Sequence, residues 1–263
     1  MASQKKIRLP KGFESLEASQ NESQIRQKCL LKSRSKRCRN LAEVLADCEG
    51  DDWPCLSGAC PVCFRANRRK IIPETIKLYG QYPALKAVTL IFYEEAMTSK
   101  EFMAWDVRPL IVKLRKKFGR CGVRGPVIGS FDIDYHTDIK RWLPHLHLLI
   151  SSDEAGLKAL RRYMKRPKNM VRDGVKNRPM LVQGIHDPAK QASYLFKSYW
   201  SEVYCYSKNG KRRTGKRRLK TRHLALSLVK LDQLGLQGGL LLYGLRYSGD
   251  KLRVIKQCHR GRQ

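Results

Sequence analysis

The sequence predicts an α+β fold in which an antiparallel sheet carries helices on one face. The first observation is a set of apolar, β-branched stretches typical of strands, at residues 84–93, 126–135 and 143–150. The second is the helical spacing of apolar residues in stretches that alternate with these strands, at residues 102–119, 155–164 and 187–204. The third is the seven-residue linker between the last two strands, which is short enough for a hairpin. This order of elements is typical of an α+β layer.

The chain before the sheet divides into a basic arm and a cysteine-rich module. Residues 1–47 are polar and basic, with a helical pattern over 23–45 and the charged segment KSRSKRCRN at 32–40. Residues 48–80 form the cysteine-rich module, which ends in a helix predicted over 65–79.

The central domain is predicted to span residues 81–207. A short apolar segment at 180–185 precedes its last helix. That helix, over 187–204, is expected to begin with Asp187 as its N-cap and Pro188 at its first helical position, because these residue types suit those positions.

The C-terminal part, residues 208–263, begins with a strongly basic stretch. In KNGKRRTGKRRLKTR, residues 208–222, nine of fifteen positions are Lys or Arg. Such a stretch can bury almost nothing, so it predicts either a mobile loop or a strand hairpin directed at phosphate. The last forty residues form a glycine-interrupted apolar segment whose pattern predicts no role.

The charge of the chain predicts a polyanionic partner. There are 54 Lys and Arg against 23 Asp and Glu, a formal net charge of +31. A surplus of this size repels itself unless a polyanion is near. Nucleic acid is favoured over an anionic membrane or an acidic protein, because the basic residues are spread along the chain among tyrosines and tryptophans. The residues predicted to contact DNA are Arg65, Arg68, Arg69, Lys211, Arg212, Arg213, Lys216, Arg217 and Arg218.

No secretory signal and no transmembrane segment is predicted. The first residues lack an apolar core, and the longest apolar candidate, LGLQGGLLLYGL, is 12 residues long and rich in glycine. We therefore expect a cytoplasmic protein without a membrane partner. In that compartment the nine cysteines are expected to be metal ligands or buried thiols rather than disulfides.

Two histidines share one face of the third predicted strand, PHLHLLI. Side chains alternate along a strand, so His145 and His147 point one way while Leu146 and Leu148 point into the core. Two neutral imidazoles on one face make half of a divalent metal site. The alternative is a pair of surface or structural histidines.

The neighbouring strand offers the missing ligand. Asp132 and Asp134 also share a face, and hairpin pairing would bring one of these carboxylates beside the histidines. Two His and one carboxylate suit Mn²⁺ or Mg²⁺ with open positions for phosphate oxygens. His136 is a competing ligand, although the pattern assigns it to the loop.

A tyrosine and a lysine follow at helical spacing. Tyr194 and Lys197 lie three residues apart, so both project from one face of the predicted helix. A tyrosine hydroxyl titrates near ~10, and a nearby cation and a metal would help it act as a nucleophile. Tyr199 lies about 140° around the same helix and is not expected to share the site. The alternative is that Tyr194 is a core residue of an amphipathic helix.

The cysteine-rich module predicts a structural zinc site. CLSGACPVC supplies Cys55, Cys60 and Cys63, and the fourth ligand is Cys48 or Cys38. The alternative is a group of buried free thiols, because the usual second CxxC is absent.

Several of these motifs together resemble one superfamily. PHLHLLI resembles the His-hydrophobic-His motif of the HUH endonucleases, and the 47-residue step to SYLFK is similar to their YxxK tyrosine motif. KAVTLIFY resembles the first-strand motif of the same superfamily. Within it, WLPHLH and CPVCFRANRR are most similar to rolling-circle replication initiators of small bacterial plasmids. The resemblance covers roughly residues 55 to 205.

The resemblance implies a fold, a chemistry and a set of roles. It implies an HUH-like α+β domain that nicks one DNA strand through a 5′-phosphotyrosine on Tyr194. Lys197 would balance the negative charge on the phosphate or on the incipient phenolate. His145, His147 and Asp132 would hold Mn²⁺ or Mg²⁺, with Asp134 as the alternate carboxylate.

The sequence departs from the family pattern at two places. Leu143 replaces a first histidine that is not one of the two motif ligands. Lys190 stands where many initiators carry a glutamate that activates water for a second cleavage, so the second cleavage would need another acid or a second protomer.

The implied partners are single-stranded or supercoiled origin DNA, with a host helicase and polymerase, and a homodimer is one option. Single-stranded DNA would lie along the sheet and stack on Trp142 or Trp200. Two alternatives stay open: a transposase or mobilisation relaxase of the same superfamily, and a zinc-stabilised nucleic-acid-binding protein without catalytic activity.

Overall fold

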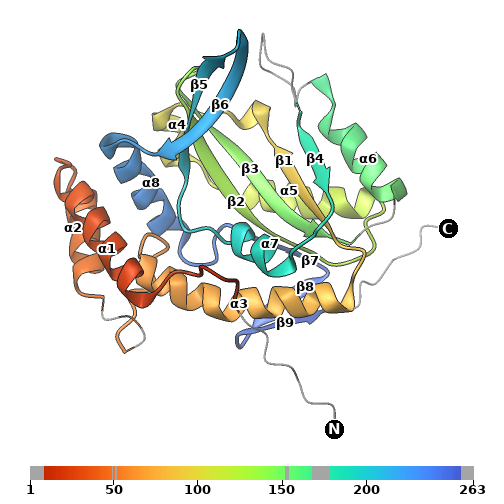
Figure 1. The fold of residues 1–263 in the computed structure, drawn as a ribbon, viewed down its shortest axis with the longest axis horizontal. Coiled ribbons are helices and arrows are strands. Elements are labelled where there is room, and N and C mark those ends of the chain that lie inside the picture. Colours follow the sequence, from red (N-terminus) through yellow and green to blue (C-terminus); the bar gives the residue numbers. More distant parts are fainter. Residues whose placement is uncertain (1–8, 49, 51, 152–153, 168–177, 256–263) are drawn as a thin grey trace.

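One curled, mostly antiparallel sheet organises the chain (Figure 1). The computed structural model describes residues 9–48, 50, 52–151, 154–167 and 178–255. The strand order is β4-β1-β3-β2-β5-β6, and a further strand, β7, pairs with β2. The strands of this sheet are β1 (Lys86–Ile91), β2 (Val127–His136), β3 (Arg141–Ile150), β4 (Met180–Gln183), β5 (Ser201–Lys208), β6 (Lys211–Arg218) and β7 (Leu240–Tyr243). The α+β prediction is therefore confirmed.

The central hairpin of β2 and β3 is longer than predicted. The strands pair antiparallel over their whole lengths, so the loop expected over 136–142 shrinks to residues 137–140. Lys140 adopts a positive φ of 52°, as a tight turn requires. His136 and Trp142 consequently belong to the strands rather than to the loop.

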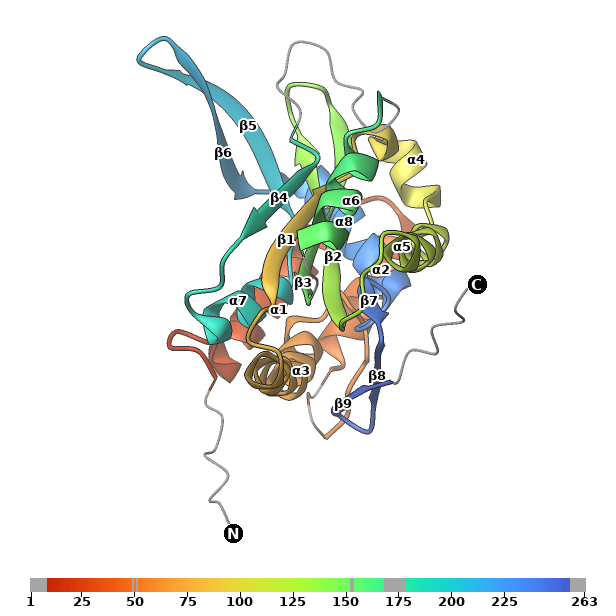
Figure 2. The same ribbon diagram turned by 90° about the vertical axis from the view of Figure 1, so that its right-hand side faces the viewer.

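Helices cover both faces of the sheet, which corrects the prediction of one covered face. On one face, apolar side chains of β2 and β3 such as Phe131 and Leu146 pack against four helices: α4 (Ser99–Ala104), α5 (Arg108–Arg120), α6 (Glu154–Met164) and α8 (Thr221–Leu234). On the other face, Ile128 and Leu149 pack against α3 (Pro61–Gln81) and α7 (Pro188–Leu195). Figure 2 shows α7 and α5 on opposite sides of the strands. A short 3-10 helix, η1 (Tyr93–Glu95), follows β1.

The N-terminal helical region is two helices rather than the single one predicted over 23–45. They are α1 (Leu16–Leu31) and α2 (Lys36–Ala46), and the chain turns between them. Their buried residues, including Leu30 and Leu45, join the core formed with α8. Within the described residues, α1 and α2 of the basic arm are thus packed onto the domain.

The helix predicted over 187–204 begins as expected but ends early. The Asp187 side chain accepts a hydrogen bond from the backbone N–H of Lys190, and Pro188 occupies the first turn. The helix ends at Leu195, where Phe196 leaves helical geometry, and the chain then enters β5. Of the two predictions for residues 208–222, the strand hairpin is the correct one, because β5 pairs with β6.

The C-terminal segment completes the central sheet. β7 pairs with the first half of β2, and a second small sheet of β8 (Leu245–Ser248) and β9 (Lys251–Val254) follows. Among the described helices, none combines the length and the apolar character needed to cross a bilayer.

Candidate functional site

The histidines and Asp132 meet on one face of the central hairpin, as the strand alternation predicts. In the β2–β3 register Asp132 lies opposite His145, and His147 lies opposite Thr89 of β1. All of these side chains point to the face that carries α7. His145, His147 and Asp132 are buried, so their polar atoms depend on one another and on nearby side chains.

Direct contacts tie these residues together. His147 places Nε2 3.4 Å from Asp132 Oδ2 and Nδ1 3.0 Å from Thr89 Oγ1. The Lys197 ammonium forms an ion pair with the same Asp132 oxygen. Nδ1 of His145 is buried and has no hydrogen-bond partner among the described residues. A cation therefore already contacts the carboxylate, and an imidazole nitrogen of the opposite residue on β3 has no hydrogen bond among the described residues.

Burial and charge set the protonation of this cluster. Burial favours the neutral form of Asp132, yet contact with His147 and the ammonium groups of Lys197 and Lys216 hold its pKa below its ordinary value. Burial lowers the pKa of His145 to about 4, against the opposing effect of the nearby Asp134 and Asp132 carboxylates. At neutral pH the cluster therefore holds an ionised carboxylate and a neutral His145 imidazole, the form that binds metals.

Asp134, the alternate ligand, is used for structure. Its Oδ1 accepts a hydrogen bond of 2.9 Å from the backbone N–H of Ser201, and its Oδ2 accepts one of 2.6 Å from Lys216. These bonds fix the start of β5 and the end of β6 to β2. His136, the competing ligand, lies at the end of β2 with its ring stacked 6.1 Å from that of His145. Asp134 also lies near His145, but Asp132 is the carboxylate that contacts His147 directly.

The predicted nucleophile lies over the histidines. The Tyr194 ring is 5.0 Å from the His147 ring in an edge-on arrangement, and 46% of the tyrosine is exposed. Lys197 lies beyond the end of α7, with its ammonium 5.7 Å from the Tyr194 ring and 5.9 Å from the Tyr199 ring. The two predicted residues meet because the chain leaves the helix, and not through a shared helix face. Tyr199, expected to lie outside the site, is absent from the lining of the cavity that contains the histidines, but its ring lies near Lys197 and lines the larger cleft.

Two cavities share Tyr194 and Lys216 in their linings. The smaller, of about 300 Å³, contains the two histidines, Thr89 and two residues that sequence reasoning missed, Gln183 and Gln191. The larger, of about 830 Å³, extends from Tyr194 along α1, the start of β5 and the end of β6. A chain-like ligand in the larger cleft could therefore reach the phenol and the histidines beyond it.

The tryptophans predicted to stack on DNA are core residues. Trp142 is fully buried and stacks on Phe102 at 4.2 Å, and Trp200 is 5% exposed and meets the same ring edge-on. The exposed aromatic side chains at the cleft are instead Tyr194 and Tyr199. Once β3 is seen to begin at residue 141, alternation alone assigns Trp142 to the core face.

The predicted basic residues after the cysteines divide into structural and exposed groups. Arg68 is buried, forms an ion pair with Glu14 and donates to Ser193, so it faces the protein and not phosphate. Arg65 is half-buried and donates from Nε to the Glu14 carbonyl. Arg69 is exposed.

The positive charge of the β5–β6 hairpin is partly neutralised by acidic residues of β5 itself and of the domain beneath it. Its ion pairs are Arg212 with Asp138, Lys216 with Asp134, Arg217 with Glu202 and Arg218 with Glu22. Lys211 and Arg213 of the predicted set are exposed. The hairpin is therefore held over the cleft by its own basic side chains, with further cations directed outward.

The four predicted cysteines form the tightest group of metal-binding side chains. In the described part of the chain, the ligand atoms of four side chains all lie within 4.8 Å of one another. These side chains are Cys48, Cys55, Cys60 and Cys63. The Cys48 sulfur lies 3.4 Å from the Cys63 sulfur and 3.6 Å from the Cys60 sulfur, and the Cys55 sulfur lies 3.7 Å from the Cys63 sulfur. These separations suit four thiolates around one zinc ion. Cys38, the alternative fourth ligand, is buried elsewhere, in α2.

Hydrogen bonding within the group favours a thiolate. Bonds from Cys55 and Cys60 hold the pKa of the Cys63 thiol far below its ordinary value, against the effect of burial. The thiolate is the form that binds metals. The cluster could therefore hold a metal such as zinc.

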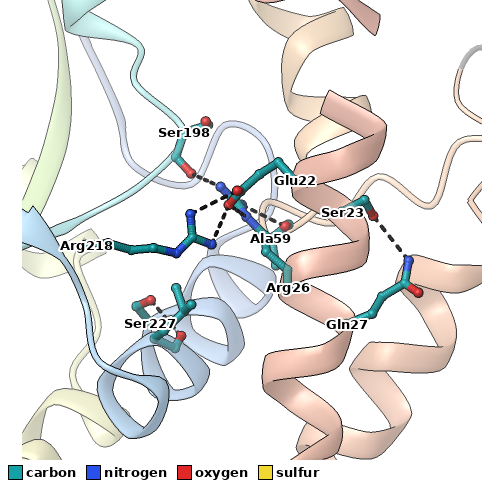
Figure 3. A network of polar contacts seen from close by, with 9 residues as sticks. Glu22, Ser23, Arg26, Gln27, Ala59, Ser198, Arg218 and Ser227 are labelled. Carbon is teal, nitrogen blue, oxygen red and sulfur yellow. Dashed lines mark hydrogen bonds and ion pairs between the residues drawn. The ribbon is translucent and has the colours of Figure 1, made fainter. Parts of the chain in front are cut away.

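A buried arginine links this cysteine group to the cleft (Figure 3). Arg26 of α1 donates to the Ala59 carbonyl at 2.9 Å, to the Ser198 carbonyl at 3.1 Å and to Glu22 at 2.8 Å. Glu22 also accepts two bonds of 2.9 Å from Arg218 of β6. Sequence reasoning missed this network, because its members come from four separate segments.

Comparison of the chain with protein-family models, with curated proteins and with solved structures finds no match.

Proposed function

We propose that the protein is a site- and strand-specific endonuclease and strand transferase for single-stranded DNA, and that it initiates rolling-circle replication of a plasmid or phage. The observation that carries this proposal is the position of the Tyr194 ring, 5.0 Å from His147, above a face shared by His145 and Asp132. A cleft lined with cations and tyrosines leads to that phenol. Phosphate chemistry is favoured because these groups combine a nucleophile with positive charge.

The proposed catalytic metal is Mn²⁺ or Mg²⁺ at His145, His147 and Asp132. The buried Nδ1 atom of His145, which lacks a hydrogen-bond partner among the described residues, and the ionised Asp132 fit a cation. Among the described residues these three do not form a closed group of ligand atoms within 4.8 Å, and Lys197 contacts the carboxylate. Loading would therefore require the ring positions to adjust and Lys197 to move away from Asp132. When bound, the metal would withdraw charge from the scissile phosphate.

The chain's own residues supply the remaining chemistry. Tyr194 Oη forms a bond to phosphorus while the bond from phosphorus to the 3′-oxygen breaks, which leaves a 5′-phosphotyrosine and a 3′-hydroxyl. The phenol proton passes to solvent and the departing oxygen gains one. Lys197 and Lys216 stabilise the developing phenolate, since both ammonium groups lie beside Tyr194. The free 3′-hydroxyl can prime a polymerase.

The test is a matched pair of tyrosine variants. With Mn²⁺ and labelled single strands, Tyr194→Phe should reduce the protease-sensitive covalent adduct by about 10⁴-fold or more, while DNA binding changes only a few-fold. Tyr199→Phe is the control, because that ring lines the larger cleft but not the cavity that contains the histidines. An adduct that persists in Tyr194→Phe would show that the nucleophile is another residue.

A transposase or relaxase of the same superfamily is the second candidate function. Both tyrosines lie near the Lys197 ammonium and line one cleft, an arrangement that suits two alternating nucleophiles. If Tyr199→Phe permits the first cleavage but blocks strand rejoining, the paired-tyrosine function is favoured over the initiator. The third candidate, a zinc-stabilised binding protein, is favoured by the tight cysteine group and predicts no adduct with any strand or metal.

A further inference from the structure

A second basic surface is carried by α5 and α6. Figure 2 shows α5 on the side of the strands opposite α7, which covers the candidate site. Alternation in β3 directs His145 and His147 towards α7, whereas Leu146 and Leu148 pack in the core with α5 and α6. On α5 and α6 there is a groove of about 680 Å³. Its charged lining consists of one acidic residue, Asp106, and six cations, Arg108, Lys113, Lys116, Lys117, Arg120 and Arg166.

Most of this charge is not neutralised by the fold. Arg108 forms an ion pair with the adjacent Asp106, and Lys113 forms one of 3.2 Å with Glu94. In the described part of the chain, no acidic residue pairs with the other four cations of the groove. Uncompensated cations gathered in one groove repel one another, so the surface favours a polyanionic ligand.

The spacing of the cations suits a regular row of phosphates. Lys113, Lys116, Lys117 and Arg120 recur at three- and four-residue intervals, so they lie along one side of α5. Seven residues of helix span about 10 Å. Consecutive phosphates of one strand lie farther apart through space than their axial rise of about 3.4 Å, so a row of this length can contact about two of them.

The groove offers charge but no open aromatic surface. The Tyr163 ring is buried, with the Lys117 ammonium 4.2 Å and the Arg166 guanidinium 5.4 Å from its centre. These cation–π contacts hold the two cations in place and cover the ring. Proteins that bind single strands stack bases on exposed aromatic rings, and this groove has none in its lining.

We propose that the α5–α6 groove binds the phosphate backbone of double-stranded DNA, separately from the site at Tyr194. Backbone contacts alone require cations at regular spacing, which the groove provides. A protein partner would need apolar or aromatic anchors and a membrane would need apolar insertion, whereas the exposed apolar side chains among the lining residues are only Pro109 and Val112, neither of them aromatic. The same molecule would then hold duplex on one side of the sheet and a single strand on the other.

The experiment compares two triple variants of the full chain by fluorescence anisotropy. Lys116→Gln/Arg120→Gln/Arg166→Gln removes exposed cations of the groove and leaves Lys117 on Tyr163. The control, Lys36→Gln/Arg37→Gln/Arg39→Gln, removes the same charge from exposed positions of α2. The probes are a blunt 25-base-pair duplex of arbitrary sequence, a single strand of equal length and vesicles of anionic phospholipid.

We expect the groove variant to bind duplex about tenfold or more weakly and to lower the log–log salt slope by about 2 to 3, with the α2 control changed by less than about threefold. Single-strand binding and adduct formation at Tyr194 should be preserved in the groove variant. The duplex measurement therefore tests the groove even if the protein does not nick DNA. The inference is overturned if the groove variant keeps its duplex affinity, if the α2 variant loses as much, or if vesicle binding falls while duplex binding does not. Matching thermal midpoints exclude misfolding.

Discussion

Two buried polar clusters in this chain differ in how completely their hydrogen bonds are formed. In the Arg26 network, all three nitrogens of a guanidinium that is 2% exposed have acceptors: Glu22 and the carbonyls of Ala59 and Ser198. In the sheet cluster, Nδ1 of the buried His145 has no partner among the described residues.

The difference separates groups that stabilise the fold from groups that are kept for another purpose. An unsatisfied buried polar atom costs about 1–3 kcal/mol, whereas a satisfied one is neutral or favourable. The Arg26 network joins α1, the cysteine loop and the cleft, so we assign it to stability. Within the described residues, the sheet cluster keeps an unsatisfied buried atom, and a function at this site would explain why the protein retains that energetic cost.

Metal removal should produce the largest change in stability, because the cysteine group adjoins the Arg26 network. Ala59, which accepts a bond from Arg26, precedes the ligand Cys60, so zinc would hold one end of the network. Stripping one zinc per chain with a strong chelator should lower the free energy of unfolding by about 5 kcal/mol or more, measured by calorimetry and metal analysis. Cys38→Ser, a thiol outside the group, should keep its zinc; an unchanged melting temperature in the metal-free protein would contradict a structural role.

His145→Ala should separate activity from stability. Nicking should fall about 10³-fold, equivalent to about 4 kcal/mol in the barrier, while the thermal midpoint stays within about 2 °C or rises because an unsatisfied buried atom is removed. The control is its neighbour on the opposite face: Leu146→Ala should cost about 2–5 kcal/mol of stability. If His145→Ala lowers the stability, this histidine stabilises the fold as the Arg26 network does, and the distinction between the two clusters is wrong.

Arg26→Met should have the opposite effect. It leaves the buried Ala59 carbonyl and the part-buried Ser198 carbonyl without this donor, so we expect about 3 kcal/mol of lost stability in urea unfolding, with adduct formation preserved in the folded fraction. Arg34→Met, at an exposed position between α1 and α2, should be neutral. Equal stability of the two variants would mean that the network contributes nothing.

Glu22→Gln should give the smallest change and a diagnostic pH dependence. Burial alone would raise the pKa of Glu22, but bonds from Arg218 and Arg26 keep it below the ordinary value of 4.5. The carboxylate therefore stabilises the fold fully above about pH 4.5, and this contribution is lost as the pH falls through the lowered folded pKa. The variant should be about 1.5 kcal/mol less stable at pH 7 and approach the wild type in acid. A pH-independent difference would argue against an ionic role.

Local pattern was enough to predict the central hairpin and its polar face. The alternation of His145 and His147 with leucines fixed which side chains face the core, and the short linker fixed the pairing partner. Asp187 and Pro188 located the start of α7, because capping chemistry is local.

Features that depend on distant segments escaped the sequence. No glycine or proline marks the end of α7 at Leu195, so the pattern predicts too long a helix and assigns Tyr199 to it. Arg26 appears as one more cation of a basic arm, and only the folded chain shows its acceptors 33 and 172 residues away. The β5–β6 ion pairs were hidden for the same reason.

The pairing of β7 with β2 has a consequence for biosynthesis. Residues 240–243 supply the partner of Val127–Ser130 in the middle of the sheet, more than a hundred residues after β2 emerges. During translation the ribosome must release Tyr243 before this edge can close. A nascent chain that stalls earlier would display an open strand edge beside its histidines, ready to pair with a neighbour instead.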